Sequence, residues 1–184
     1  MPEINKPNSQ ATTDISIRKL VASDCAVIAN AFQSQGWNKP REKFELYLEQ
    51  ASHGLRDVLV AESEDEFAGY FTVFWEPLYP YFRSRGIPEI QDFNVLGKFQ
   101  KRGIGTLLMD AAEALIAKRS DRAGIRVGLD VDCGTAQRLY VKRGYIPDGN
   151  GISHNLTFLK YGDEVTVDDD LILAFTKELE GGRQ

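Results

Sequence analysis

The stretch that decides the fold is residues 90–117, which read IQDFNVLGKFQKRGIGTLLMDAAEALIA. Residues 90–96 mix β-branched and aromatic side chains, as strands do. Residues 97–105 form a short basic segment punctuated by glycines. Apolar residues then recur at the spacing of one helical face, at Ile104, Leu107, Leu108, Ala111, Ala112, Leu115 and Ile116. The stretch therefore predicts a strand that passes through a glycine turn into an amphipathic helix.

The predicted turn has the chemistry of an anion-binding site. The first N–H groups of a helix have no intrahelical partner, and the helix dipole adds partial positive charge there. Gly103 and Gly105 carry no Cβ, so a phosphate can approach the backbone closely. Lys101 and Arg102 add full positive charges. We therefore predict a phosphate or pyrophosphate site over residues 100–106.

Two common phosphate-binding patterns do not match this turn. The P-loop pattern ends in Gly-Lys-Ser or Gly-Lys-Thr, which the stretch lacks. The dinucleotide fingerprint needs a small residue at its sixth position, and counting from Gly103 that position is Leu108. An unrelated nucleotide- or phosphate-binding protein stays open as an alternative.

A third pattern does match. Residues 100–105, QKRGIG, give Gln-x-x-Gly-x-Gly, and residues 92–95, DFNV, lie on the strand before it. Residues 136–145, AQRLYVKRGY, give Ala-x-x-Leu-Tyr-x-x-x-Gly-aromatic. The two segments, in this order, resemble the acetyl-coenzyme A motifs of the GNAT N-acetyltransferase superfamily. The resemblance is incomplete at Gly97, where proline is common, and at residues 132–134, where the family often has asparagine.

The resemblance implies an α/β fold with a central mixed, mostly antiparallel sheet that splays between two parallel strands and has helices on both faces. The parallel strands would be residues 90–96 and 124–130. A single N-acetyltransferase domain would span residues 15–184, after a loose tail at 1–14. Other expected elements are a strand at 15–18, two helices, a hairpin of 57–62 with 67–75, a loop at 76–88, and a closing hairpin of 155–161 with 170–176.

Composition agrees with one soluble domain. The chain has 184 residues, of which 42% are hydrophobic and 27% charged. No apolar run reaches membrane-spanning length, and no signal-peptide layout is present, so no membrane partner is expected. The chain has two cysteines, Cys25 and Cys133, and a single disulfide would not form the framework of a domain of this size. This favours a reducing cytoplasm. The net charge of −5 argues against nucleic acid as a partner. No metal site is expected, because no Cys/His cluster has zinc spacing.

The resemblance also implies the cofactor site. Acetyl-coenzyme A would be the co-substrate, with its pantetheine arm and thioester carbonyl bound by free backbone groups near Val95. The residues expected to contact it are Phe93, Asn94, Val95, Gln100, Lys101, Arg102, Gly103, Ile104, Gly105 and Thr106.

Two residues are candidates for catalysis. Tyr140 matches the family tyrosine that donates a proton to the departing thiolate; the alternative is that it only packs on the core. Asp92 would organise the acceptor amine or act as the base; the alternative is a structural carboxylate. Asp130 and Asp132 are further candidates because they end the adjacent strand. The residues leave the identity of the general base open.

The acceptor site is expected to be aromatic, because aromatic faces attract cations. The candidates are Trp37, Trp75, Tyr79 and Tyr81, together with Asp130. Phe71 and Phe74 are better explained as core residues of a strand than as part of the acceptor site.

These residues predict an acyltransferase that moves acetyl from acetyl-coenzyme A to a primary amine of a small molecule or peptide. Because no nucleophile–base pair is recognisable, direct attack in a ternary complex is expected. The alternative is a non-catalytic GNAT-fold module that binds coenzyme A or acts as a sensor. The identity of the amine, the strictness for acetyl and the oligomeric state, including a homodimer, stay open.

Overall fold

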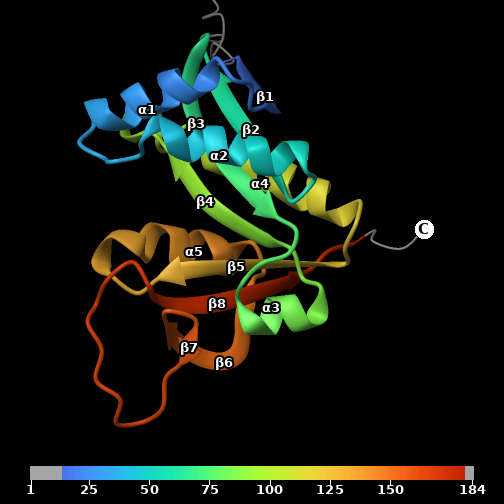
Figure 1. Cartoon of the computed structure of the whole chain (residues 1–184), viewed down its shortest axis with the longest axis vertical. Coiled ribbons are helices and arrows are strands. Elements are labelled where there is room, and N and C mark those ends of the chain that lie inside the picture. The colour runs from blue at the N-terminus through green and yellow to red at the C-terminus, as the bar shows by residue number, and fades with distance from the viewer. Residues whose placement is uncertain (1–13, 181–184) are drawn as a thin grey trace, which may run out of the picture.

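A computed structural model describes residues 14–180 of the chain (Figure 1). Most of the expected tail, residues 1–14, lies outside this range, and the Asp14 carbonyl accepts a hydrogen bond from Glu64 N. The elements are, in chain order, β1 Ile15–Lys19, α1 Asp24–Ser34, α2 Arg41–Ser52, β2 Arg56–Ser63, β3 Glu66–Phe74, α3 Pro80–Arg85, β4 Glu89–Val95, η1 Gly97–Phe99, α4 Ile104–Ala117, β5 Arg122–Gly128, η2 Val131–Cys133, α5 Gly134–Lys142, β6 Ile146–His154, β7 Thr157–Phe158 and β8 Leu171–Glu178.

The strands form one mixed sheet with the order β1-β2-β3-β4-β5-β8-β6-β7. Within the described residues, β4 and β5 are the one parallel pair, and the other neighbours run antiparallel. The parallel pair meets only where Glu89 lies opposite Gly124 and Ile90 opposite Ile125. The two strands then diverge toward their carboxyl ends. The predicted mixed, mostly antiparallel sheet, splayed between its parallel strands, is confirmed.

Helices cover both faces of the sheet. In Figure 1, α1 and α2 lie in front of β2–β4, and α4 lies behind them. The apolar stripe of α4 packs on β3, β4 and β5 and is buried at Ile104, Leu108, Ala112 and Ile116. Leu107, which the spacing also placed on that face, is 40% exposed. The amphipathic helix predicted from residue 104 is confirmed with that one exception.

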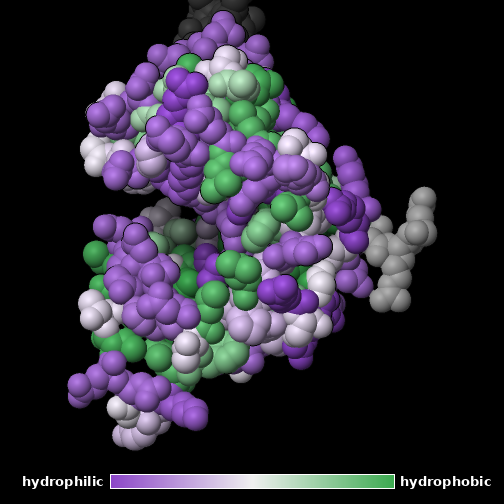
Figure 2. Space-filling model, in the orientation of Figure 1, coloured by the Kyte–Doolittle hydropathy of each residue, from purple (hydrophilic) through white to green (hydrophobic). Residues whose placement is uncertain are grey.

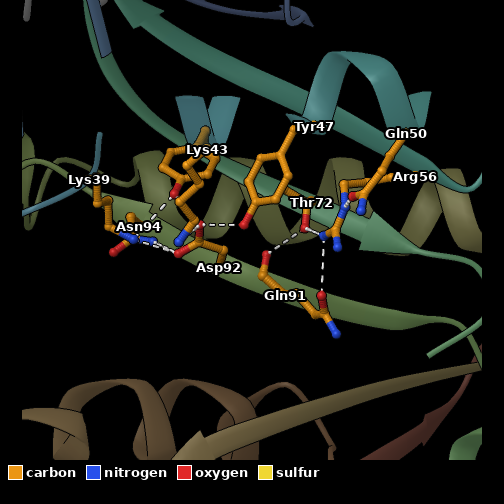
Figure 3. A network of polar contacts seen from close by, with 10 residues as sticks. Lys39, Lys43, Tyr47, Gln50, Arg56, Thr72, Gln91, Asp92 and Asn94 are labelled. Carbon is orange, nitrogen blue, oxygen red and sulfur yellow. Dashed lines mark hydrogen bonds and ion pairs between the residues drawn. The ribbon is translucent and has the colours of Figure 1, made fainter. Parts of the chain in front are cut away.

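A β-bulge interrupts β4 opposite β3. Tyr70 pairs with Asn94 and Thr72 with Gln91, so two residues of β4 oppose one residue of β3. Asp92 takes a positive φ of 49° at this point. As a result, the neighbouring side chains of Gln91 and Asp92 both reach the side of the sheet that α2 covers (Figure 3).

Residues 76–88 were expected to be a loop, but they contain helix α3, Pro80–Arg85. Its boundaries follow ordinary helix signals, with Pro80 in the first turn and Gly86 at the end in a left-handed conformation, φ 62°. Tyr79 and Phe82 are fully buried in a small second core with Ile87 and Ala174. The aromatic side chains of Tyr79 and Phe82 therefore pack in the protein core.

The expected closing hairpin of residues 155–161 and 170–176 is wrong. Strand β7 pairs with β6, and β8 lies between β5 and β6. The sequence of β8, LILAFTKE, is buried at almost every early position, which suits an interior strand. Residues 148–151 are an irregular stretch within β6, where the register shifts between Pro147 and Ile152.

None of the helices in the part of the chain described here is long and apolar enough to cross a membrane.

Candidate functional site

The divergence of β4 and β5 opens the molecule at the carboxyl ends of both strands. In Figure 2 the surface is hollowed between the part that carries α1 and α2 and the part that carries α5. The turn of residues 97–105 follows β4 at this opening, and η2 and α5 follow β5. Both sequence motifs therefore meet at the same edge of the sheet.

The geometry of the turn matches the predicted anion site. Gly103 precedes α4 with a φ of 84°, and Lys101 also has a positive φ, 61°. The first backbone hydrogen bond of α4 runs from Leu107 N to Gly103 O and is 3.1 Å long. The N–H groups before Leu107 therefore have no acceptor within the helix. The side chains of Lys101, Arg102 and Thr106 are exposed beside them.

The space above the turn suits a phosphate. A Cβ at Gly103 would meet no atom within 4 Å, and one at Gly105 would lie 3.6 Å from the Phe93 ring. Gln100 Nε2 donates to Val95 O at 3.3 Å and so ties the turn to the end of β4. The structure places the predicted cofactor residues side by side on β4, the turn and the start of α4, namely Phe93, Asn94, Val95, Gln100, Lys101, Arg102, Gly103, Ile104, Gly105 and Thr106. A pyrophosphate with a pantetheine arm fits this arrangement.

Asp92 is the centre of a polar network between β4 and α2 (Figure 3). Its carboxylate lies 2.5 Å from Lys39 Nζ and 2.9 Å from Lys43 Nζ. It accepts hydrogen bonds from the Tyr47 hydroxyl at 3.0 Å and from the Tyr70 hydroxyl, and a third from Asn94 Nδ2 at 3.0 Å. Both carboxylate oxygens therefore have partners.

The charge state of Asp92 follows from these partners. Burial alone would raise the pKa of Asp92, but the ammonium groups of Lys39 and Lys43 and the hydroxyl of Tyr70 hold that pKa well below its usual value. Burial lowers the pKa of Lys39, against the opposing effect of Asp92. An ionised carboxylate with filled acceptor positions is a weak base, so this geometry favours the structural alternative for Asp92. Lys39, Lys43 and Tyr47 were not singled out from the sequence, although Lys43 and Tyr47 are spaced for one helical face.

Tyr140 lies in α5 and is only 4% exposed. Its ring is tilted against that of Tyr145, with centroids 6.1 Å apart. Burial, with a smaller effect from Cys133, raises the pKa of Tyr140. The phenol therefore stays protonated at neutral pH, as a proton donor must.

Asp130 has a local structural role. Its carboxylate accepts hydrogen bonds from Asp132 N at 2.8 Å and Cys133 N at 3.2 Å. Asp130 is thus the residue that caps η2, the segment leading into α5. These bonds fix the start of the helix that carries Tyr140.

Two of the four aromatic acceptor candidates are in the core. Trp75 is 9% exposed; its Nε1 donates to Asp57 at 3.0 Å, and the Arg119 guanidinium lies 3.8 Å from the ring centroid. Tyr79 is fully buried, and its hydroxyl donates to Asp148 at 2.7 Å. Their polar atoms are already hydrogen-bonded within the core, which argues against direct contact with an acceptor.

The other two aromatic candidates reach the surface. Trp37 is 45% exposed and stacks on Phe32 at 5.7 Å, between α1 and α2. It lines a cavity of about 490 Å³ together with Lys39. Tyr81 is partly exposed on α3 and lies under the Arg85 guanidinium, 4.0 Å from it. Trp37 alone of the four lies next to the Asp92 network, through Lys39.

A further polar cluster, not predicted from the sequence, lies beside that network on the same face of the sheet (Figure 3). Arg56 is its centre and is 6% exposed. The cluster borders a cavity of about 420 Å³. Polar residues that line this cavity are Gln50, Arg56, Gln91, Arg126, Asn155 and Asp170. Within residues 14–180, no group of three or more His, Cys, Asp or Glu side chains is arranged to hold a metal ion.

Comparison with known proteins agrees with this geometry. Residues 25–145 match the model of the acetyltransferase (GNAT) family. No curated protein sequence matches significantly. A solved GNAT-family protein from Desulfovibrio desulfuricans superposes with a TM-score of 0.67 at 15% identity, over 90% of this chain and 99% of that one.

Two further solved structures are similar in fold. One is the Salmonella typhimurium acetyltransferase that modifies the N-terminal serine of ribosomal protein L7/L12, with a TM-score of 0.67, 14% identity and coverage of 92% of this chain and 97% of that one. The other is Ard1 from Thermoplasma volcanium, with a TM-score of 0.65, 18% identity and coverage of 90% and 97%. The expected GNAT-like fold is confirmed.

Proposed function

The chain belongs to the GNAT family of acetyltransferases, and from that premise we propose that it transfers acetyl from acetyl-coenzyme A directly to a primary amine in a ternary complex. Membership makes the protein an acyltransferase. The acceptor, the roles of individual residues and the direct mechanism are the proposed part.

One observation carries the proposal. The β4–β5 pair ends after Ile90 and Ile125, and the exposed turn at the start of α4 lies at the opening that results. Backbone groups of β4 beyond the bulge are left without a β5 partner, while the α4 N-terminus offers N–H groups to an anion. One end of coenzyme A can thus be held at the turn while the other extends along β4.

When bound, acetyl-coenzyme A supplies an activated thioester. In the transfer, the amine nitrogen forms a bond to the acetyl carbon, the carbon–sulfur bond breaks, and the nitrogen loses one proton. Tyr140 gives its phenolic proton to the leaving sulfur and regains one from solvent. Because burial raises the pKa of Tyr140, the phenol holds its proton until this step.

We assign Asp92 to positioning. Its ion pairs with Lys39 and Lys43 fasten α2 and the preceding loop to the β4 bulge. The hydroxyls of Tyr47 and Tyr70 already donate to the Asp92 carboxylate, so neither these side chains nor Asp92 serves as the base. The amine then loses its proton to water. The two free cysteines, Cys25 and Cys133, suit a reducing, cytoplasmic setting.

The acceptor is a primary amine. The Salmonella neighbour acts on a protein N-terminus, so a peptide amine is one acceptor class for this chain and a small-molecule amine is the other. The cavity bordered by Arg56, at about 420 Å³, has the size of a small-ligand site, which favours the small molecule.

Two measurements test the proposal. Isothermal titration with acetyl-coenzyme A, ATP and NAD should show selective binding of acetyl-coenzyme A. A thiol-release assay against an amine library should then show turnover. Binding without turnover for any amine would support a non-catalytic coenzyme A-binding module, and binding of ATP or NAD alone would reject the cofactor assignment.

A further inference from the structure

The side chain of Arg56 is a buried cation with neutral partners. Its Nε donates to Gln50 Oε1 at 2.7 Å, and its Nη1 donates to Thr72 Oγ1 at 2.5 Å and Gln91 Oε1 at 3.2 Å. These are amide and hydroxyl oxygens, and the hydrogen bonds recorded within residues 14–180 use two of the three guanidinium nitrogens. Figure 3 shows the guanidinium between Gln50, Thr72 and Gln91.

Aromatic rings hold the guanidinium in place. The Arg56 Cζ atom lies 4.5 Å from the ring centroids of both Tyr47 and Phe74. Together with the bonds to Gln50 and Thr72, these contacts fix the plane of the group. The guanidinium of Arg56 is therefore pre-organised, and little conformational entropy would be lost when it binds an anion.

Among the described residues that line the cavity, Arg56 is the cation without a direct ion pair; the carboxylates of Asp92 and Glu89 act on it without contacting it, and Glu89 does so through Gln91, whose Nε2 donates to Glu89 at 2.9 Å. Arg126 is paired through Nε with Glu89 Oε1 at 2.6 Å, and Glu89 is 1% exposed. Asp170, which also lines the cavity, is exposed, so solvent screens its field. A buried charge is costly unless a counter-charge accompanies it, and a carboxylate in the cavity would supply one in bidentate geometry.

We infer that Arg56 recognises a carboxylate of the acceptor, so that the acetylated amine belongs to a small amino acid whose amine lies several bonds from the carboxylate. This inference rests on the proposed acetyl transfer and names its substrate class. Gln91 lines the cavity, and Phe93–Val95 lie two to four residues further along β4, at the proposed thioester position. A regular strand rises about 3.3 Å per residue and the bulge at Asp92 shortens that rise, so Gln91 and the proposed thioester position are at most roughly 7 to 13 Å apart.

The separation predicts a preference for chain length. An α-amine is too close to its own carboxylate to reach both sites. The acceptors expected are ω-amino acids such as δ-aminovalerate and ε-aminocaproate, or lysine through its side-chain amine. Glycine and β-alanine should be poor acceptors.

A paired acceptor series tests this recognition by thiol release. The series runs from glycine through β-alanine, γ-aminobutyrate, δ-aminovalerate and ε-aminocaproate to lysine, each compared with its carboxamide. The longer acids should exceed their amides in kcat/KM by roughly 10- to 100-fold, the range for hydrogen bonds to a charged group. Arg56→Gln should abolish that preference. The control Arg122→Gln removes an exposed β5 arginine paired with Glu178 and should keep it.

A binding measurement separates this inference from acetyl transfer itself. With arginine labelled by nitrogen-15, N-acetyl-ε-aminocaproate should shift the Arg56 Nε–H resonance saturably, whereas its carboxamide should not; the Arg56→Lys variant assigns the signal. A shift without turnover would retain the carboxylate site and reject the transferase. Turnover with equal rates for acids and amides, or a preference that survives in Arg56→Gln, would overturn the carboxylate site and retain the transferase.

Discussion

The Lys39 ammonium lies 2.5 Å from the Asp92 carboxylate, and each of these side chains is 15% exposed. This ion pair joins the segment between α1 and α2 to the bulge of β4, 53 positions along the chain. Asp92, the carboxylate of the first sequence motif, therefore fastens the segment before α2 to β4.

Replacing Asp92 with Asn should destabilise the protein strongly. The change leaves Lys39 and Lys43 without their counter-charge, and breaking a buried pair in this way costs about 3–5 kcal/mol in the free energy of unfolding. Urea unfolding followed by circular dichroism measures it. The control Glu45→Gln removes the exposed partner of Arg41 and should cost less than about 0.5 kcal/mol. Equal, small losses in both variants would mean that the Asp92 network adds little stability.

The stabilisation from Asp92 should also depend on pH. Since the pKa of Asp92 is lower in the folded state than its unfolded value of about 3.9, its contribution is fully present above that value and is lost as pH falls through the folded one. The difference in unfolding free energy between wild type and Asp92→Asn should be constant from about pH 5 to 8 and shrink below about pH 4. Urea midpoints at a series of pH values measure it, and a difference that does not change with pH would contradict the ion pair.

A matched pair of glycines tests the anion site. Gly103 and Gly36 have φ values of 84° and 83°, and a Cβ at either would meet no atom within 4 Å. Gly103→Ala and Gly36→Ala should therefore lose similar stability, about 1–2 kcal/mol, from left-handed strain. Only Gly103→Ala should weaken acetyl-coenzyme A binding, by tenfold or more, about 1.4 kcal/mol. Isothermal titration decides, and equal affinities in the two variants would place the phosphate elsewhere.

Tyr79 should affect stability and not the acceptor. Its hydroxyl donates to Asp148 at 2.7 Å inside the second core. Tyr79→Phe removes that bond and should lower the free energy of unfolding by about 1–3 kcal/mol. The Michaelis constant of the acceptor should stay at its wild-type value in steady-state assays. A raised Michaelis constant with unchanged stability would show that Tyr79 contacts the acceptor, as the sequence analysis expected.

The predictions that were confirmed rest on local sequence patterns. The strand, turn and helix around Gly103 depend on residues within one short segment, so periodicity and glycine placement were sufficient. The Asp92 network joins α2, β3 and β4, and it requires a bulge at a non-glycine residue with positive φ, for which the sequence has no local signal. The place of β8 between β5 and β6 likewise depends on long-range pairing. Helix α3 did have a signal in Pro80 and Gly86, but the density of prolines favoured a loop.

The proton donor to sulfur is tested by Tyr140→Phe. The change removes one oxygen and keeps the ring against Tyr145, so stability and acetyl-coenzyme A affinity should stay near wild type. General acid catalysis contributes roughly 10²–10⁴-fold, so turnover in thiol-release kinetics should fall within that range, or somewhat less where water substitutes.

The pH profile of Tyr140→Phe distinguishes donation from packing. Because burial raises the pKa of Tyr140, the wild-type phenol is protonated throughout the range from about pH 6 to 9, and the rate should drop by the same factor across it. The rise of the rate with pH, which reports loss of the amine's proton, should keep its position. Full turnover in the Phe variant would show that Tyr140 only packs. A loss of rate matched by a loss of thermal stability would show that the hydroxyl supports the fold and donates no proton.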